Sequence, residues 1–114
     1  MDILINTTPH TIVLYKNGKP WKEFLPSKDH QLRLKSEPTT EFELDGFPVI
    51  SAPQFTDVDG EMPLGPILVS MLVGNFLADK RRNVYGPDTR PASVVRDEMD
   101  QIIGTKRLIK YSTI

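Results

Sequence analysis

The chain has 114 residues, of which 39% are hydrophobic and 25% are charged, and its formal net charge is −1 at pH 7. These values are ordinary for a globular protein, so they exclude general disorder and predict a single domain over residues 1–114. The absence of cysteine excludes disulfides, cysteine-bound zinc and thiol catalysis. The first residues are too few and too acidic for a signal peptide and no apolar run could span a bilayer, so we expect a cytoplasmic protein without membrane contacts.

The first half of the sequence is typical of antiparallel β structure. Alternating, β-branched and aromatic residues predict strands at 3–5, 11–15, 21–25, 31–35, 41–44 and 47–51. Asn17-Gly18 and Asp45-Gly46 predict the hairpin turns that join two pairs of these strands, because such residues tolerate the positive φ of a type I′ turn. Pro48 cannot donate a hydrogen bond to a neighbouring strand, so its strand is expected at a sheet edge.

The second half of the sequence predicts a loop, a short strand and a hairpin in turn. Residues 52–66 hold three prolines, two glycines and three acids, a composition that predicts a long ordered loop. The apolar residues 67–70 predict a short buried strand. Near the end, residues 93–103 predict a last hairpin around a turn at 97–100, and residues 106–111 alternate again.

One main helix is predicted at about residues 70–80, with Ser70 as its N-terminal cap. Leu72 and Phe76 are four residues apart, so we expect both to face the core. Gly74 weakens a helix by about 1 kcal/mol relative to alanine, which suggests a close neighbour or ligand at this position. The predicted class is α+β, a small antiparallel β-sheet domain with one main helix and a C-terminal β-hairpin.

Positive charge is concentrated at one end of the chain. Residues 80–114 carry eight Lys/Arg and four Asp/Glu, a net charge of +4, so the other residues carry −5. Several of these cations lie beside Gly, Pro and Asp, which form ordered turns. This arrangement suits a small anionic ligand better than a long polyanion. The isoelectric point of about 6.1 also argues against a dedicated DNA or RNA binder.

Arginines that converge could grip a pyrophosphate, because each guanidinium offers a planar fork of donors. The candidates are Arg82, Arg90, Arg96 and Arg107. Asp88 and Asp97 would accept hydrogen bonds from ribose hydroxyls, and Phe76 or Tyr85 would stack on a base. The alternative interpretation of residues 80–82 is a solvated basic run that compensates the dipole of the preceding helix.

No catalytic or metal site is expected. The sequence has no phosphate-loop motif, no nucleophile motif and no metal-binding histidine pattern. His10 either bonds the backbone of the turn after Pro9 or contacts a ligand. Asp57 and Asp59 precede Gly60 but lack the full spacing of a calcium loop. We therefore expect no cofactor, no metal and no enzymatic activity.

Several segments, in chain order, resemble a group of small phage and bacterial proteins. They are Asn6-Thr-Thr-Pro-His10, Ile67-Leu-Val-Ser70, Pro87-Asp88, Val95-Arg96-Asp97-Glu98 and Ile102-Ile103-Gly104 to Arg107-Leu108. The first is similar to the Asn-Leu-Thr-Pro-His opening of that group, with Thr7 in place of leucine. After Asp57 the chain departs from the group, since Gly60-Glu-Met-Pro63 stands where Gly-Leu-Pro is typical. Through these segments the chain resembles the first type of Thoeris anti-defence proteins.

The resemblance implies a phage sponge, which sequesters without cleavage the cyclic ADP-ribose signals made by bacterial TIR-domain immune proteins. It also implies a homo-oligomer in the host bacterial cytoplasm, with contacts from residues 47–51 or 52–66. The candidate ligand-binding residues are Asn6, His10, Ser70, Phe76, Arg82, Asp88, Arg96, Asp97 and Arg107. Two alternatives remain. One is an inhibitor that binds a host or defence enzyme through the acidic first half, and the other is a small nucleotide hydrolase that uses Asp88 or Asp97 with a metal.

Overall fold

This computed structural model describes residues 4–114. Within them the chain forms twelve short strands and one helix, joined by loops and turns. In chain order they are β1 (Ile5–Asn6), β2 (Ile12–Lys16), β3 (Lys19–Phe24), β4 (Arg33–Ser36), β5 (Glu41–Leu44), β6 (Phe47–Ile50), β7 (Phe55–Asp59), β8 (Ile67–Leu68), α1 (Met71–Leu77), β9 (Val84–Pro87), β10 (Val94–Arg96), β11 (Ile102–Thr105) and β12 (Leu108–Lys110). The fold is thus α+β with β structure dominant, as predicted. The expected start of the first strand, Ile3, lies outside the described residues.

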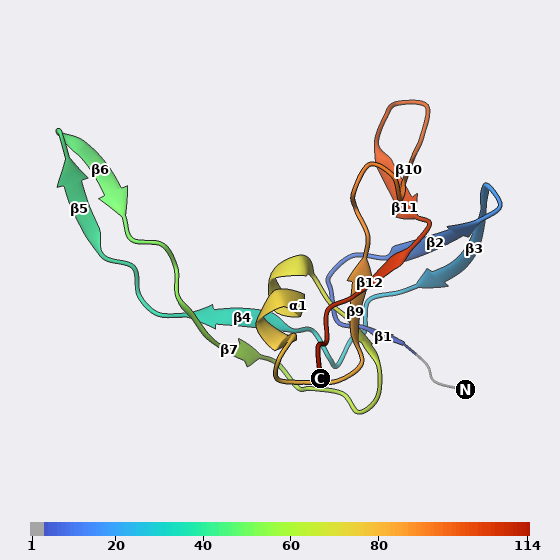
Figure 1. The fold of residues 1–114 in the computed structure, drawn as a ribbon, viewed down its shortest axis with the longest axis horizontal. Coiled ribbons are helices and arrows are strands. Elements are labelled where there is room, and N and C mark those ends of the chain that lie inside the picture. Colours follow the sequence, from blue (N-terminus) through green and yellow to red (C-terminus); the bar gives the residue numbers. More distant parts are fainter. Residues whose placement is uncertain (1–3) are drawn as a thin grey trace.

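Two four-stranded sheets form the body of the molecule (Figure 1). One has the strand order β1-β8-β9-β12 and the other β10-β11-β2-β3. Parallel pairing joins β1 to β8, β8 to β9 and β11 to β2, so the expectation of an entirely antiparallel sheet is wrong. Parallel neighbours require long connections, which is why Ile5 pairs with the distant Ile67.

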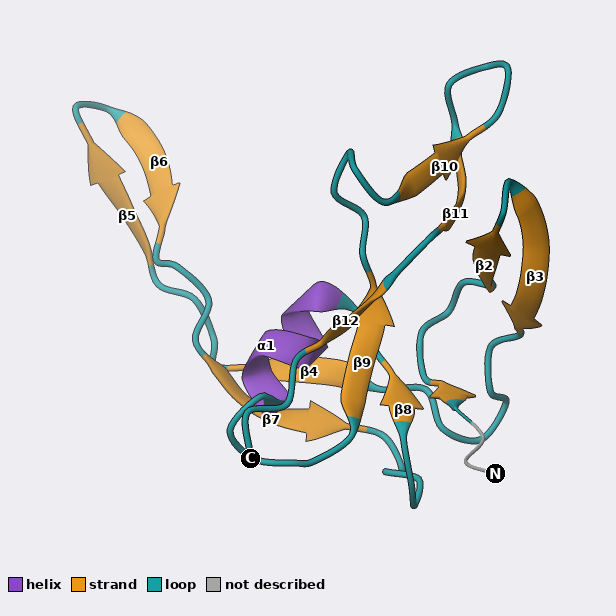
Figure 2. Ribbon diagram, turned by 45° about the vertical axis from the view of Figure 1, so that its right-hand side comes forward, coloured by secondary structure: helices purple, strands orange, loops and turns teal. Residues whose placement is uncertain are grey.

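The buried core lies on both faces of β8. Ile67 packs on one face against Val73 of α1. Leu68 packs on the opposite face against Ile12 of β2 and Phe24 of β3. Because successive side chains of a strand point to opposite faces, one short apolar run supplies two layers of core. Helix α1 therefore covers one side of the first sheet, and the second sheet packs on the other side (Figure 2).

Helix α1 begins where the sequence predicts, because the Ser70 hydroxyl accepts a hydrogen bond from the backbone N–H of Val73 at 3.4 Å. It ends at Leu77, earlier than expected. Leu72 is 55% exposed, so the expectation that it faces the core is wrong, whereas Phe76 does pack against the core. Val73 and Leu77 carry the buried face instead. No helix within residues 4–114 is long and apolar enough to cross a membrane.

The expected close neighbour of Gly74 is the ring of Tyr111. A Cβ added at Gly74 would lie 2.5 Å from Cδ2 of that ring, and one added at Gly86 would lie 2.8 Å from its Cε2. The two glycines thus form a slot between α1 and β9 that the ring fills. Burial in this slot, and secondarily the charge of Asp88, raise the pKa of the Tyr111 phenol.

Both predicted hairpin turns are present. Asn17 and Gly18 have φ values of 54° and 75°, and Asp45 and Gly46 have φ values of 51° and 82°. Positive φ at both turn residues is the requirement of a type I′ turn. The turns join β2 to β3 and β5 to β6 in antiparallel pairs. Pro48 lies in the two-stranded β5–β6 ribbon, where both strands are edges, as predicted.

Other segments differ from the sequence prediction. Residues 52–66 are not only a loop, because they contain β7, which pairs with β4. Gly86 and Pro87, residues that are uncommon in strands, lie in β9, an interior strand of the first sheet. Antiparallel pairing joins β10 to β11 across residues 97–101, but β12 then pairs with β9, so the chain does not end in that hairpin. The strands that pair with β7, β9 and β12 are distant in the sequence or are reached through a long connection. Local composition therefore does not reveal these pairings.

Candidate functional site

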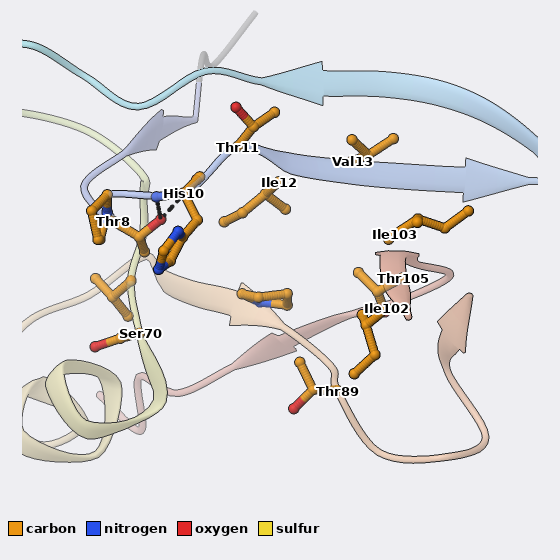
Figure 3. Close-up of a pocket in the computed structure, with 14 residues that line it drawn as sticks. Thr8, His10, Thr11, Ile12, Val13, Ser70, Thr89, Ile102, Ile103 and Thr105 are labelled. Atoms are coloured by element: carbon orange, nitrogen blue, oxygen red, sulfur yellow. Dashed lines mark hydrogen bonds between the residues drawn. The ribbon is translucent and has the colours of Figure 1, made fainter. Parts of the chain in front are cut away.

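A pocket of about 530 Å³ opens in the body, with residues from both sheets around it (Figure 3). Four segments line it: residues 8–13, residues 69–70, Pro87 with Thr89, and residues 102–105. This volume falls within the roughly 300–1,000 Å³ typical of small-molecule sites. The pocket therefore has room for one compact ligand.

The lining of the pocket is apolar with hydroxyl groups distributed around it. Ile12 and Ile102 provide apolar surface and Thr89 contributes a hydroxyl, whereas the Thr8 hydroxyl is already bonded to Asn6. None of the described residues that line the pocket is Lys, Arg, Asp or Glu. A lining of this composition suits the uncharged part of a ligand, such as a base or a sugar.

Asn6 holds the turn that carries His10 into the pocket lining. The Asn6 amide nitrogen donates to the backbone oxygens of His10 at 2.7 Å and Phe24 at 3.0 Å. The Asn6 amide oxygen accepts from the backbone N–H of Thr8 at 3.0 Å and from its hydroxyl at 2.7 Å. Buried Asn6 therefore supports the site rather than lining it, and the turn is held through the backbone of His10, which leaves its ring at the pocket.

Ser70 also lines the pocket, at the start of α1. Its hydroxyl already accepts the capping hydrogen bond of the helix. Of the nine candidate residues, His10 and Ser70 are the two that line this pocket.

Asp88 follows β9 as a buried carboxylate, only 1% exposed. Arg90 binds both of its oxygens, with Nε and Nη2 each at 2.9 Å, and the Ser93 hydroxyl donates to Oδ2. Arg107 approaches the same Oδ2, with its Nε at 3.9 Å, and donates from Nε to the Ser93 hydroxyl at 2.7 Å. The oxygens of Asp88 are thus occupied by side chains of its own chain. This differs from the sequence prediction, in which Asp88 accepts hydrogen bonds from ribose hydroxyls.

Hydrogen bonds from the Arg90 side chain, then from Ser93, hold the pKa of Asp88 well below its usual range despite its burial. The hydrogen bonds to Asp88, and secondarily its negative charge, in turn raise the pKa of Arg90. Two guanidinium groups share one carboxylate, so this cluster carries a surplus positive charge. Among residues 4–114 the terminal nitrogens of Arg107 have no hydrogen-bond partner, and its side chain is more than half exposed.

Thr105 connects this cluster to the pocket. Its hydroxyl donates to the backbone oxygen of Asp88 at 2.6 Å and accepts from the backbone N–H of Arg107 at 3.3 Å, and the residue also lines the pocket. Thr89, another lining residue, lies between Asp88 and Arg90 in the chain. Thr89 and Thr105 therefore connect the wall of the pocket to the backbone of the charged cluster, although Asp88, Arg90 and Arg107 are not themselves lining residues.

The candidates on or beside α1 lie elsewhere. Phe76 packs against the core, and Nζ of Lys80 lies 4.3 Å from the centroid of its ring. Arg82 precedes the start of β9, whereas Asp88 follows its end (Figure 1). The length of β9 thus separates Arg82 from the charged cluster.

Arg96 and Asp97 shape the turn between β10 and β11. Arg96 donates from Nη1 to the backbone oxygen of Asp100 at 2.7 Å, and Oδ1 of Asp97 accepts from the backbone N–H of Met99 at 2.9 Å and of Gln101 at 3.0 Å. The four arginines considered from the sequence are therefore not gathered into one group, since Arg90 and Arg107 are the pair that meets at Asp88.

Sequence reasoning missed Ser93 and Thr105 as parts of the site. An aspartate directly after a strand can form an Asx turn, in which its side chain accepts a hydrogen bond from the backbone N–H two residues later. Asp88 does so, since its Oδ1 accepts from the backbone N–H of Arg90 at 3.1 Å. The contacts to Thr105 cross between strands, so no local pattern announces them.

Comparison of the chain with protein-family models, with curated proteins and with solved structures found no match. In the part of the chain that the structure describes, no group of three or more His, Cys, Asp or Glu residues could hold a metal ion. The site is therefore interpreted from its own geometry, an apolar pocket joined to a cluster with unused guanidinium donors.

Proposed function

We propose that the protein is a phage anti-defence sponge, which binds and sequesters a compact anionic nucleotide of the cyclic ADP-ribose type without cleaving it. The observation that supports this proposal is the uncharged pocket of about 530 Å³, whose lining residue Thr105 bonds the backbone of Arg107, an arginine with unused terminal nitrogens in the described chain. A cyclic ADP-ribose isomer has the same division into an uncharged base with sugars and an anionic pyrophosphate.

The pocket supplies the contacts for the uncharged part of the nucleotide. The base would lie on the apolar surface of Ile12 and Ile102, with the ring of His10 available for stacking. The hydroxyl of Thr89 can both donate to and accept from a ribose hydroxyl. These groups bind and orient the ligand without any acid or base.

Arg107 supplies the main contacts for the pyrophosphate, because Nε and Nη2 of Arg90 are already bound to Asp88. Charge-assisted hydrogen bonds between a guanidinium fork and phosphate oxygens are among the stronger ones in proteins. Asp88 and Ser93 hold these side chains before any ligand arrives, which lowers the ordering cost of binding. A preorganised site of this kind favours slow release, which is what a sponge requires.

Calorimetric titration with cyclic ADP-ribose isomers tests the proposal, followed by heat denaturation and chromatography of the released ligand. We expect binding of at least one isomer and recovery of the intact ligand. Recovery of an altered product would overturn the sponge and favour the hydrolase. No heat with any isomer would also overturn it.

Two variants locate the site. Arg107→Ala is expected to weaken binding about 10- to 100-fold, because charge-assisted hydrogen bonds of roughly 1.5–3 kcal/mol are lost. Ile103→Trp is expected to abolish binding by filling the pocket while leaving the arginines in place. Arg82→Ala is the matched control, since it removes the same charge at the other end of β9, and an equal loss of affinity in this control would contradict the site.

The second candidate, a protein-binding inhibitor of a host or defence enzyme, is favoured by one feature. Residues 36–61 carry seven Asp/Glu and no Lys or Arg, and such a segment would steer the protein toward a basic surface. Binding of a defence enzyme that weakens steeply with added salt, in a protein that ignores every isomer, would establish this alternative.

A further inference from the structure

Positive charge gathers at the turn of the β2–β3 hairpin, at the outer end of the second sheet (Figure 1). Lys16, Lys19 and Lys22 follow one another around this turn, and residues 12–22 contain no Asp or Glu. The turn therefore carries three positive charges and no negative one, although the chain as a whole has a net charge of −1. Such a local concentration of charge attracts polyanions whatever the isoelectric point of the whole chain.

These lysines are not neutralised by the rest of the described chain. All three are exposed, and within residues 4–114 no carboxylate lies within ion-pair distance of their ammonium groups. The register of the hairpin also places Lys16 directly opposite Lys19. Like charges directly opposite each other destabilise a ribbon, so an anion bound across the turn would relieve a repulsion that the free protein retains.

An exposed aromatic ring lies among the lysines. Trp21 is the only tryptophan of the chain and is 61% exposed. Nζ of Lys16 lies 5.5 Å from the centroid of its ring, within the range of a cation–π contact. An exposed ring between cations is the arrangement that stacks on a base while the cations bind the neighbouring phosphates. We call Lys16, Lys19, Trp21 and Lys22 the basic hairpin patch.

The hairpin is fixed at both of its ends, so the basic hairpin patch is held in one arrangement. Phe24 at the end of β3 is buried in the core. The ring of Tyr15 packs on Gly104 of β11, where an added Cβ would lie 2.5 Å from its Cε1. The type I′ turn at Asn17-Gly18 closes the other end. A preorganised surface of this kind loses less conformational entropy when a ligand binds.

We propose that the basic hairpin patch binds single-stranded nucleic acid, with Trp21 stacked on a base and the lysines on the phosphates around it. A membrane surface fits less well, because Asn17 and Gly18 are the outermost residues of the hairpin and an interfacial anchor needs apolar residues there. In a duplex the bases are already stacked on one another, so Trp21 would gain no partner. The patch is separate from the nucleotide pocket, since none of its residues lines that pocket.

The fluorescence of Trp21 tests the proposal directly, because no other residue contributes tryptophan emission. Oligothymidylate and oligouridylate of roughly ten nucleotides are expected to quench this emission as a base stacks on the ring. A plot of log K against log salt should have a slope of about −2, because three phosphate contacts each release about 0.7 counterion. Unchanged emission, together with unchanged anisotropy of the labelled oligonucleotides, would overturn the proposal.

Anions without bases separate stacking from charge. Inorganic polyphosphate and polyglutamate are expected to bind less tightly than the oligonucleotides and to leave the emission of Trp21 unquenched. Equal affinity for these polymers would overturn the proposal, because it would show a general anion surface. A blue shift of the emission with vesicles of phosphatidylserine and phosphatidylcholine, in a protein that ignores the oligonucleotides, would overturn it in favour of a membrane surface.

Variants of exposed residues separate the two kinds of contact, with the anisotropy of the labelled oligonucleotide as the measurement. Trp21→Leu is expected to weaken binding about tenfold and to leave the salt slope unchanged, whereas Trp21→Tyr keeps a stacking ring and most of the affinity. Lys19→Gln should reduce the salt slope by about 0.7. Lys28→Gln is the matched control, since it removes the same charge beyond the opposite end of β3.

An equal loss of affinity in Lys28→Gln and Lys19→Gln would contradict the site. Equal affinities of Trp21→Leu and the wild type would also contradict it, because stacking would then contribute nothing. These measurements use no cyclic nucleotide, so their failure is distinguishable from failure of the proposed function.

Discussion

The two type I′ hairpins of this chain begin from the same local chemistry and end in different surroundings. Asn17-Gly18 joins β2 to β3, and Asp45-Gly46 joins β5 to β6, with positive φ at all four residues. Phe24 in the first hairpin is 9% exposed and packs with Leu68, whereas Phe47 in the second is 74% exposed. The turn sets which residues pair across a hairpin, but a distant part of the chain decides whether a face is covered.

The largest expected effect comes from truncating the covered phenylalanine. Phe24→Ala should lower the free energy of unfolding by about 3–5 kcal/mol, because it removes a buried aromatic ring and leaves a cavity beside Leu68. Urea denaturation measures this change. A loss below about 1 kcal/mol would show that the β2–β3 hairpin is not an integral part of the core.

The next effect concerns Asp88 and depends on pH. The native carboxyl has a lowered pKa, whereas in the unfolded chain it binds a proton near pH 3.9. Its contribution to stability is therefore complete above that pH and is lost as pH falls toward the lower native pKa. Asp88→Asn should destabilise the protein at pH 7, and the difference from the wild type should shrink between about pH 5 and pH 2.

Thermal denaturation of the two proteins across this pH range provides the measurement. The hydrogen bonds from Arg90 and Ser93 are the stated cause of the lowered pKa. A difference in stability that stays constant with pH would contradict that cause, because it would mean that ionisation of Asp88 contributes nothing to folding.

A smaller effect is expected in the slot between α1 and β9. Gly74→Ala adds a Cβ 2.5 Å from the ring of Tyr111, so the ring or the helix has to move, at a cost of about 1–3 kcal/mol. Asn75→Ala on the exposed side of the same helix is the control. There alanine should be neutral or slightly stabilising because of its helix propensity. Stabilisation by Gly74→Ala would contradict the packing of Tyr111 in this slot.

The smallest effect is expected in the arm, the β5–β6 ribbon that extends away from the body of the molecule (Figure 1). Phe47→Ala should change the free energy of unfolding by no more than about 0.5 kcal/mol, because the ring is exposed. A loss as large as that of Phe24→Ala would remove the contrast between the two hairpins. It would mean that the arm packs on its own body.

The candidate site was predictable in part. His10 and Ser70 are candidates that line the pocket, whereas Asp88 binds Arg90 and Ser93 of its own chain instead of being free for a ribose hydroxyl. Arg96 instead holds the turn after β10, because the backbone oxygen of Asp100 in that turn is a nearby acceptor for its guanidinium. Spacing along the chain identifies residues of suitable chemistry, but the strand pairings decide which of them share a location.

The sequence by itself determined the features that depend on neighbours in the chain. These are the positive-φ turns, the cap at Ser70, the alternation of the early strands and the concentration of charge after residue 80. They follow from backbone sterics and local hydrogen bonds, which act over a few residues.

Only the tertiary structure decided the parallel pairing of β1 with β8, the rotation of α1 onto Val73 and Leu77, and the contact of Asp88 with Arg107. It also decided that the β2–β3 hairpin is covered while the apolar side chains of the β5–β6 ribbon are exposed. Each of these contacts joins segments that approach only when the chain closes a long loop, and the free energy that holds them comes from burying surface contributed by both segments together.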